Sequence, residues 1–529
     1  MPSFFRLLGT GLCACALSLS GCRDSDPPPS VPDSGTPEPG PLIERGDYVD
    51  VVPKEPCMAP TYEPPPGASC SNPSSFSLSG CDMRAVGAVE PSGVYQAIFR
   101  YNATSTFSAG FRLDTNPSFL GRPLVYNQVG PEGFFITGQY RSSSNNSQQL
   151  YALAGCRVPE PGRITGCFVR CTNNVPEYVG TFDARRMNLA REAPTGAQPL
   201  RLVSETDVPP QGDSVDVYVT KGHAYVVSLS KGAVLGGLSV FNVSDPAHPV
   251  LTKTVQMTGD SYWNGVWAKG DALYVASGNS GVAVFDITDP ANPVYLRSLP
   301  GGGPIDVHTV FVDGDRLYAM SPSPTGETLV FDVASPLEPQ LLSRLVVPHA
   351  AGSSYPHDAF AYGDRLYVNH TVAGYKILDL KRPDVATVLG TYSFQGNYSH
   401  ANAVGTIDGR TIAFEGGERF GAHLRVLDVT DPANIRLIGE VKKREHTSIH
   451  NMVLKGTRLY VAWYHEGVRV FDVSKPEQPK EIASFDSFQE SDPRSTDSLY
   501  QGAIGIRVPG DGYVYVVDMS RGLLVLAEP

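Results

Sequence analysis

The chain has 529 residues, of which 41% are hydrophobic and 18% are charged, so it can bury large cores and should form more than one domain. Its formal net charge of −12, and its lack of basic runs interleaved with aromatic residues, argue against a nucleic-acid-binding surface or a polybasic membrane patch. Beyond the N-terminus, no apolar stretch approaches the length of a membrane-spanning helix.

The chain begins with a segment typical of export signals. Arg6 is followed by an apolar run over residues 7–19 and then by the sequence LSGC, which ends at Cys22. This resembles a bacterial lipobox, and the resemblance implies that residues 1–21 are a signal peptide and that Cys22 becomes the lipidated first residue. The alternative is an ordinary secretory signal in which Cys22 is incidental; both interpretations predict an exported protein. Arg23 is not the aspartate that marks inner-membrane retention, which favours the outer membrane or the cell surface.

A proline-rich stretch follows, and we expect residues 22–66 to form an extended tether that lifts the folded part off the membrane. The next region, residues 67–190 with Cys57 attached, contains short β-forming runs separated by Gly, Pro, Asn and Ser turns. It therefore predicts a small antiparallel β-domain, either a sandwich or a barrel. These residues do not indicate a function for this domain.

Six cysteines lie after Cys22 and before the repeats described below: Cys57, Cys70, Cys81, Cys156, Cys167 and Cys171. In an exported protein they predict three disulfides, although six cysteines allow fifteen pairings and the sequence does not choose among them. The spacing of Cys167 and Cys171 also fits half of a zinc site, but no second cysteine or histidine pair of suitable spacing accompanies it.

The rest of the chain repeats one pattern, which is clearest in Leu273–Leu299 as three β-forming runs separated by a polar turn and by Asp289-Pro290. The second run recurs in seven copies: Leu238–Asn242, Val282–Asp286, Thr328–Asp332, Tyr375–Asp379, Leu424–Asp428, Val468–Asp472 and Leu523–Ala527. A hairpin glycine precedes each first run: Gly222, Gly270, Gly314, Gly363, Gly409, Gly456 and Gly512. These glycines are 44 to 56 residues apart, a period that predicts β-propeller blades when no helix intervenes.

The repeated strands, spelled VAVFD or LRVLD and followed by DPxxP, resemble those of the LVIVD-repeat proteins, a bacterial family. The resemblance covers roughly residues 200–529 and implies an extracellular or surface propeller without implying any reaction. The predicted fold is therefore all-β: a seven-bladed β-propeller over residues 199–529, preceded by the disulfide-linked antiparallel β-domain.

The last repeat has only three strands, so the propeller should need one strand from elsewhere. We expect residues 200–208 to fill the vacancy and to close the ring with strands from both ends of the repeat region. The aspartates that end the repeated strands, Asp286 and its equivalents, could suggest calcium. However, one carboxylate per blade does not make a calcium loop, and an aspartate before a turn can accept backbone N–H groups.

One histidine stands at the mouth of the innermost strand in four successive blades: His308, His357, His400 and His450. Asp216 and Asn264 take the matching place in the first two blades, and Trp263 and Trp463 lie in nearby loops. Equivalent positions in a ring point toward one axis, so we expect these residues to form a ligand-binding top face. Imidazoles that converge there should be neutral, and they are preferred ligands of divalent transition metals.

The sequence contains no GxSxG elbow, HExxH motif or phosphate-binding loop. The leading interpretation is therefore a lipid-anchored extracytoplasmic scaffold that binds a protein, glycan or small ligand on its top face without performing chemistry. A second interpretation, drawn from propeller oxygenases by analogy, is a metalloenzyme or metal-binding protein that uses the ring of four histidines. A third is a surface protein with no ligand at all.

Overall fold

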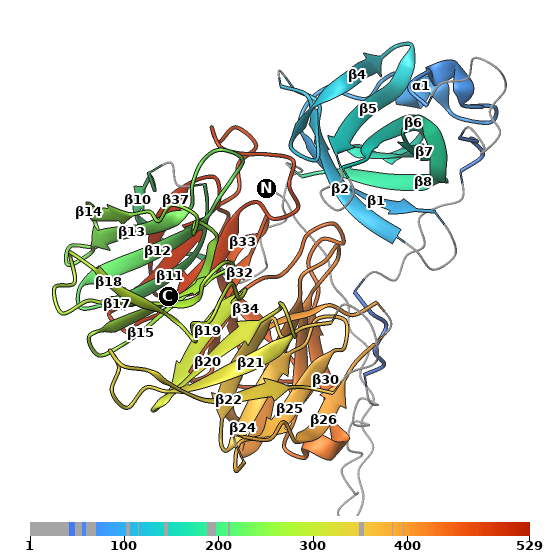
Figure 1. The fold of residues 1–529 in the computed structure, drawn as a ribbon. Helices are drawn as coiled ribbons and strands as arrows, with labels where there is room; N and C mark the ends of the chain where they lie inside the picture. The colour runs from blue at the N-terminus through green and yellow to red at the C-terminus, as the bar shows by residue number, and fades with distance from the viewer. Residues whose placement is uncertain are drawn as a thin grey trace, which may run out of the picture. The chain divides into compact units, whose positions relative to one another are not determined.

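The computed structural model describes residues 42–47, 55–59, 70–101, 106–114, 116–141, 146–187, 197–209, 212–348, 354–382, 384–394 and 396–529. They belong to one compact unit that is built almost entirely of β-strands (Figure 1). The predicted signal peptide, Cys22 and most of the predicted tether lie outside the described residues. Within the described residues, no helix has the length and apolar character needed to cross a membrane.

The N-terminal β-domain is a closed barrel of eight antiparallel strands in sequential order, in which β8 pairs with β1. Its elements are the short helices η1 (Pro73–Ser75) and α1 (Met83–Val86) and the strands β1 (Val94–Arg100), β2 (Thr106–Arg112), β3 (Ser118–Phe119), β4 (Arg122–Gly130), β5 (Gly133–Arg141), β6 (Gln148–Glu160), β7 (Arg163–Thr172) and β8 (Val175–Arg186). Of the two architectures that the sequence allows, the structure therefore shows the barrel.

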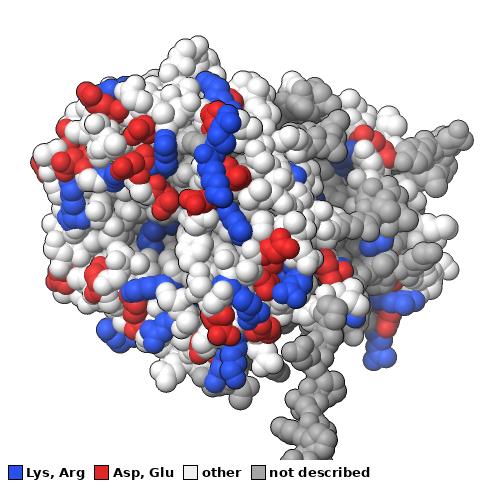
Figure 2. Space-filling view, turned by 90° about the horizontal axis from the view of Figure 1, so that it is seen from below, with Lys and Arg blue, Asp and Glu red and all other residues white. Residues whose placement is uncertain are grey.

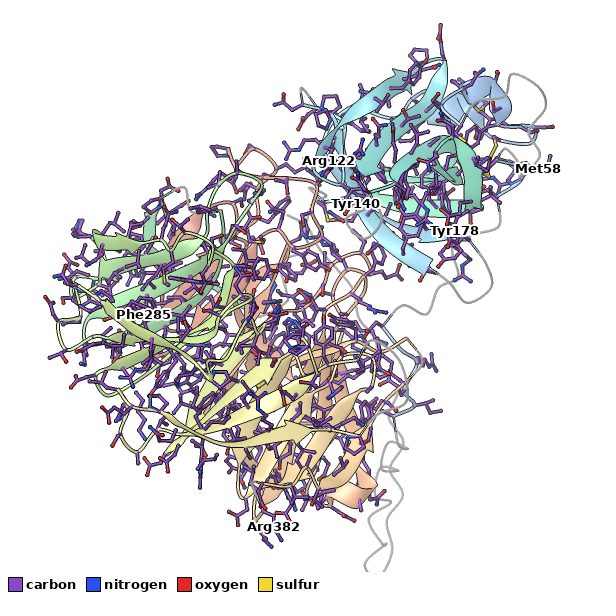
Figure 3. The ribbon with its side chains drawn as sticks, in the orientation of Figure 1. Met58, Arg122, Tyr140, Tyr178, Phe285 and Arg382 are labelled. Carbon is purple, nitrogen blue, oxygen red and sulfur yellow. A yellow bond between two sulfur atoms is a disulfide. The ribbon has the colours of Figure 1, made fainter. Side chains whose placement is uncertain are left out.

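Aromatic rings fill the barrel. Phe99 is fully buried, and its ring centroid lies 4.5 Å from that of Phe107 and 5.0 Å from that of Phe168. Nearer the surface, the guanidinium of Arg170 lies 4.0 Å from the ring centroid of Tyr178, a residue that Figure 3 labels. The interior of the barrel is thus a packed core.

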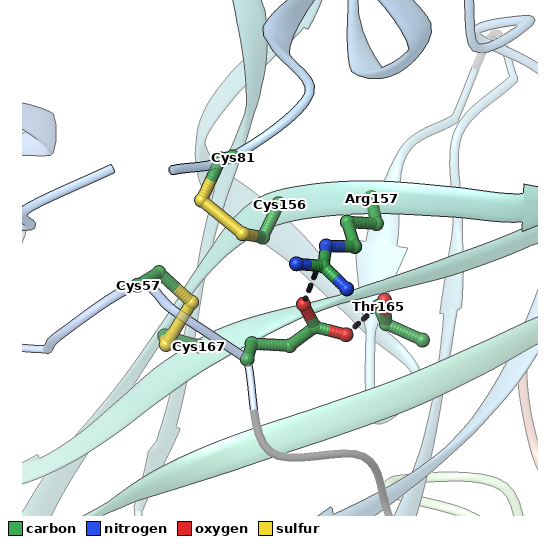
Figure 4. Close-up of a disulfide and its surroundings, with 7 residues drawn as sticks. Cys57, Cys81, Cys156, Arg157, Thr165 and Cys167 are labelled. Atoms are coloured by element: carbon green, nitrogen blue, oxygen red, sulfur yellow. Dashed lines mark hydrogen bonds and ion pairs between the residues drawn. A yellow bond between two sulfur atoms is a disulfide. The ribbon is translucent and has the colours of Figure 1, made fainter. Parts of the chain in front are cut away.

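Three disulfides join the segment before β1 to the strands β6 and β7: Cys57–Cys167, Cys70–Cys171 and Cys81–Cys156. Figure 4 shows the first and third, beside a carboxylate of Glu55 that accepts a hydrogen bond from Thr165 (2.6 Å) and pairs with Arg157 (3.5 Å). The zinc alternative for Cys167 and Cys171 is wrong, because both sulfurs are bonded to other cysteines. Three disulfides indicate an oxidising, extracytoplasmic compartment.

The C-terminal part is a β-propeller of seven blades within the described residues, each a sheet of at least four antiparallel strands. The first three blades are β11 (Asp213–Thr220), β12 (His223–Leu229), β13 (Gly237–Asn242) and β14 (Val250–Val255); β15 (Trp263–Lys269), β16 (Ala272–Ser277), β17 (Gly281–Asp286) and β18 (Val294–Leu299); and β19 (Thr309–Asp313), β20 (Arg316–Ser321), β21 (Glu327–Asp332) and β22 (Gln340–Val346).

The next three blades are β23 (Asp358–Tyr362), β24 (Arg365–Asn369), β25 (Tyr375–Asp379) and β26 (Val388–Tyr392); β27 (Ser399–Ile407), β28 (Arg410–Gly417), β29 (Leu424–Asp428) and β30 (Arg436–Val441), with η2 (Pro432–Asn434); and β31 (Met452–Lys455), β32 (Arg458–Trp463), β33 (Gly467–Asp472) and β34 (Lys480–Phe485). A short strand, β9 (Gln198–Pro199), pairs in parallel with β34.

The seventh blade closes the ring in the predicted way. It contains β35 (Ala503–Arg507), β36 (Tyr513–Asp518) and β37 (Gly522–Ala527), and its outermost strand is β10 (Leu202–Thr206), which pairs antiparallel with β37. The last strand of the chain is therefore covered on both edges, and its backbone groups find partners.

The repeat pattern has two structural causes. In five blades an aspartate ends the third strand and accepts the N–H two residues later, as from Thr288 to Asp286 (2.8 Å), which is the predicted turn role. The tyrosine of the second strand then ties its blade to the next, because Tyr274 donates to the carbonyl of Pro336 (2.7 Å). The apolar core likewise lies between blades, where Tyr274 of one blade packs in a cluster with Leu317 of the next.

Part of the predicted tether is bound to the propeller. Glu44 accepts from the guanidinium of Arg425 at 2.8 and 3.1 Å, and Asp47 lies 2.8 Å from the same group. Arg425 is fully buried. Burial works to raise the pKa of Glu44, but the hydrogen bonds and charge of Arg425 outweigh it and lower that pKa to about 2. Residues 42–47 are thus an ionic attachment to the fifth blade, where the sequence predicted a solvated tether.

Candidate functional site

A cavity of about 660 Å³ lies in the channel that the seven innermost strands surround. Every one of these strands, β11, β15, β19, β23, β27, β31 and β35, contributes residues to its wall. The outer surface is different in character: Figure 2 shows acidic and basic side chains interspersed over the face in view. In the channel, by contrast, histidine, aspartate and glutamate side chains from several blades lie around one cavity.

The structure brings the four predicted histidines together in chain order. The ring centroids are 4.2 Å apart for His308 and His357, 4.1 Å for His357 and His400, and 4.4 Å for His400 and His450. Each residue stands at the start of an innermost strand or just before it, so the repeat brings them to one level of the channel. Register in the repeat therefore predicted their proximity.

Burial keeps these imidazoles uncharged. Desolvation lowers the pKa of His308 and of His357 to about 3 and that of His450 to about 4. Desolvation and the neighbouring imidazoles hold the pKa of His400 well below its usual value. At neutral pH the rings are therefore unprotonated and present lone pairs, since protonation would bury positive charges side by side.

Glu418 completes the cluster, and the sequence reasoning missed it. Its carboxylate oxygens lie 3.6 Å from Nε2 of His400 and 3.6 Å from Nε2 of His450. The hydroxyl of Tyr464 donates to Glu418 Oε1 at 2.6 Å. Desolvation raises the pKa of Glu418 to about 7. The signal was present in the fifth repeat, where TIAFEGGERF departs from the common LYVAS-like spelling in the loop after β28.

The ring nitrogens differ in their partners. Nδ1 of His450 faces the carbonyl oxygen of Ile504 at 2.8 Å, and Nε2 of His308 lies 3.1 Å from the amide nitrogen of Asn264. Among the described residues, Nδ1 of His357 and Nδ1 of His400 are buried without a hydrogen-bond partner. The predicted residue Asn264 thus lies in the cluster as a neighbour of His308.

A second polar group lines the same cavity: Asp216 accepts the N–H of Val266 at 3.0 Å and lies 3.5 Å from the guanidinium of Arg507. Asp358 also lines the cavity. Burial raises the pKa of both aspartates. Asp216 was predicted from the sequence, whereas Asp358 and Arg507 were not, because Asp358 follows a histidine that already fitted the repeat pattern and Arg507 ends its strand.

Tyrosines line the cavity from the loops that enter the inner strands or leave the second strands. They are Tyr262, Tyr355, Tyr398, Tyr464 and Tyr500. The hydroxyls of Tyr355 and Tyr398 lie 2.9 Å apart. These rings give the cavity aromatic faces and hydroxyl groups close to the histidines.

The two tryptophans predicted to face a ligand lie elsewhere. Trp263 is fully buried between blades, where its ring packs edge-on against Phe285 (5.8 Å) and its Nε1 donates to Asp260 (2.9 Å). Trp463 is 1% exposed in another interblade cluster. Adjacent strand residues point to opposite faces, so the neighbours Asn264 and Tyr464 line the cavity while the tryptophans pack in the core.

Comparison with known proteins agrees with the repeated sequence pattern. Residues 211–257 and 262–299, in the first two blades, match the family model described as LVIVD repeat. Among curated proteins, no sequence matches the chain significantly. Similar solved structures include the computationally designed Ika8 protein (14% identity, TM-score 0.41) and the WD40 β-propeller domain of Doa1 (12% identity, TM-score 0.46). Each alignment covers 63% of this chain, and 100% and 98% of those two chains respectively. The first two blades thus carry LVIVD repeats, and they belong to a β-propeller of seven blades.

Proposed function

We propose that this protein is an extracytoplasmic binding protein that takes a small polar molecule into the central channel of its propeller and is held to a membrane by lipid on Cys22. The cavity of about 660 Å³ carries the proposal. Its volume falls in the range of about 300–1,000 Å³ typical of small-molecule sites. A folded protein partner would need a broad surface of about 800 Å² per side instead.

The lining indicates what kind of molecule fits. Tyrosine hydroxyls, neutral imidazoles and the carboxyl group of Glu418 donate and accept hydrogen bonds, while Trp267, Phe311 and Phe360 present aromatic surface. This combination favours a compact molecule with several hydroxyl groups and at least one apolar face, such as a mono- or disaccharide or a hydroxylated aromatic compound.

The cavity can be tested with a substitution that fills it. Ser498 lines the cavity, so Ser498→Trp should obstruct it, whereas Ser335→Trp places the same side chain in an exposed turn between β21 and β22. Mature protein would be analysed by native mass spectrometry and by thermal shift against a panel of saccharides and phenolic compounds. We expect a bound compound that Ser498→Trp weakens by at least about tenfold and that Ser335→Trp leaves unchanged.

Two results would contradict this part of the proposal. One is a protein that carries no small molecule and responds to no member of the panel. The other is a Ser498→Trp protein that binds as the unsubstituted protein does.

The anchor needs its own experiment, because Cys22 lies outside the described residues. Cys22→Ala should leave the precursor unprocessed or release the protein from the membrane fraction, since one side chain would carry the lipid. Detergent-phase partitioning before and after the substitution measures this. Unchanged partitioning would remove the anchor while leaving the channel proposal intact.

A further inference from the structure

We infer that His357, His400, His450 and Glu418 form a binding site for one divalent transition-metal ion in the propeller channel. The inference goes beyond the binding of a small molecule and does not require it. It also revises the ligand set expected from the sequence, because Glu418 takes the place of His308.

The spacing of the ligand atoms fits a metal centre. One ligand atom each from His357, His400 and Glu418 lie within 4.8 Å of one another. The carboxylate oxygens are 3.6 Å from Nε2 of His400 and 3.6 Å from Nε2 of His450. Bonds of about 2.0–2.1 Å in a tetrahedral site separate neighbouring ligand atoms by about 3.3 Å. Small side-chain shifts therefore suffice to bring these atoms to a shared ion.

The orientation of His450 is that of a metal ligand. Its Nδ1 faces the carbonyl oxygen of Ile504 and must carry the proton of that hydrogen bond. Its Nε2 therefore presents a lone pair toward Glu418 Oε1, which already accepts from Tyr464. A cation that lies between these two atoms would be bound by both of them. A backbone carbonyl that fixes the far nitrogen is the usual support of a ligating histidine.

The other two imidazoles are also buried, with side chains that are only 6% and 2% exposed. Nδ1 of His357 lies 3.7 Å from Asp358 Oδ2, and neither this atom nor Nδ1 of His400 has a hydrogen-bond partner among the described residues. Buried polar atoms are nearly always paired in folded proteins. In His400 the nitrogen that lies near Glu418 is Nε2, so Nε2 is the ligand atom and Nδ1 carries the proton of the neutral ring.

His308 differs from the other three histidines. Its Nε2 is engaged by the amide of Asn264, which also donates to the His308 carbonyl at 3.1 Å. It is therefore a neighbour of the site, and it supplies a matched control from the same ring of imidazoles.

The donor set selects the kind of ion. Imidazole nitrogens suit zinc, copper, iron and nickel, whereas calcium requires six or more oxygen ligands. One carboxylate beside neutral imidazoles also leaves little excess negative charge, which disfavours magnesium.

The test uses mature protein freed of metal with a chelator that is then removed. Titration with Zn²⁺ should raise the melting temperature, and calorimetry should show one ion per chain. Co²⁺ should give the visible absorption bands of a nitrogen- and oxygen-ligated ion. We expect His400→Gln and Glu418→Gln each to weaken binding by at least about tenfold, and His308→Gln to change it by less than about threefold.

Circular dichroism of each metal-free variant verifies that the propeller is folded, so that lost binding is not lost structure. A folded, unsubstituted protein that binds neither Zn²⁺ nor Co²⁺ overturns the inference, as does a Glu418→Gln protein with unchanged affinity. Neither outcome bears on small-molecule binding, which native mass spectrometry measures separately.

Discussion

The barrel and the propeller both close β-structure around an axis, yet they fill that axis in different ways. In the barrel, the inward side chains of every strand must pack against one another, and Phe99, Phe107 and Phe168 occupy the interior. In the propeller, the apolar core lies between the blades, as in the cluster of Tyr274 and Leu317. Most of the apolar packing therefore takes place away from the channel, and histidines and carboxyl groups can surround a cavity there. Because the apolar core does not lie on the axis, the channel has room for polar side chains.

The largest expected effect comes from opening the ring. Deleting residues 202–206 removes β10 and exposes the edge of β37, so that the seventh blade loses its outer strand. We expect aggregation, or a melting temperature lower by more than about 5 °C, because an unpaired edge strand invites pairing with other chains. Light scattering and tryptophan fluorescence measure this, since all three tryptophans lie in the propeller.

The barrel should remain folded in the same variant, which hydrogen–deuterium exchange of peptides from residues 94–186 would show. A deletion protein that stays monomeric and melts at the unchanged temperature would mean that ring closure adds no stability.

A second prediction sets the barrel interior against the channel wall. Phe99→Ala should lower the free energy of unfolding of the barrel by about 3–5 kcal/mol, because it empties a packed aromatic site. Tyr355→Phe removes one hydroxyl at the cavity and should cost less than about 1 kcal/mol. Denaturant titration followed by hydrogen exchange distinguishes the two regions. Equal costs would mean that the channel is packed as tightly as the barrel.

The smallest effect concerns the ionic attachment at Arg425. The pKa of Glu44 is lowered in the folded protein, so its stabilisation is present above its unfolded value of about 4.3 and fades as the pH falls toward 2. Glu44→Gln should therefore reduce stability by about 1 kcal/mol at pH 7 and by progressively less below pH 4. Thermal unfolding of both proteins across this pH range measures the difference, which a pH-independent gap would contradict.

The sequence was most informative where the structure repeats. Hairpin glycines such as Gly270 and Gly314 predicted the blades, and the three-stranded last repeat predicted the role of β10. The same register predicted that His308, His357 and His400 would meet. Repetition supports these inferences, because equivalent positions occur in seven copies of the repeat.

Where the chain departs from the repeat, the sequence was less informative. Glu418 lies in a loop whose spelling is unique to the fifth blade, so no equivalent position pointed to it. Trp263 was predicted to face a ligand together with its neighbour Asn264, but adjacent side chains of a strand point to opposite faces, and Trp263 packs in the core. The disulfide pairing depended on where the segment before β1 passes strands β6 and β7, which no cysteine spacing reveals.

The strand β10 also constrains the order in which the exported chain can be assembled. Residues leave a translocation channel N-terminus first, so the barrel and β10 emerge long before the last strand. The propeller has no closed form until Gly522–Ala527 arrives, because β37 is the partner that β10 requires. A chain that loses only its last ten residues would thus leave an open edge at both ends of the ring. The ring can therefore close only in a chain whose C-terminal strand is intact.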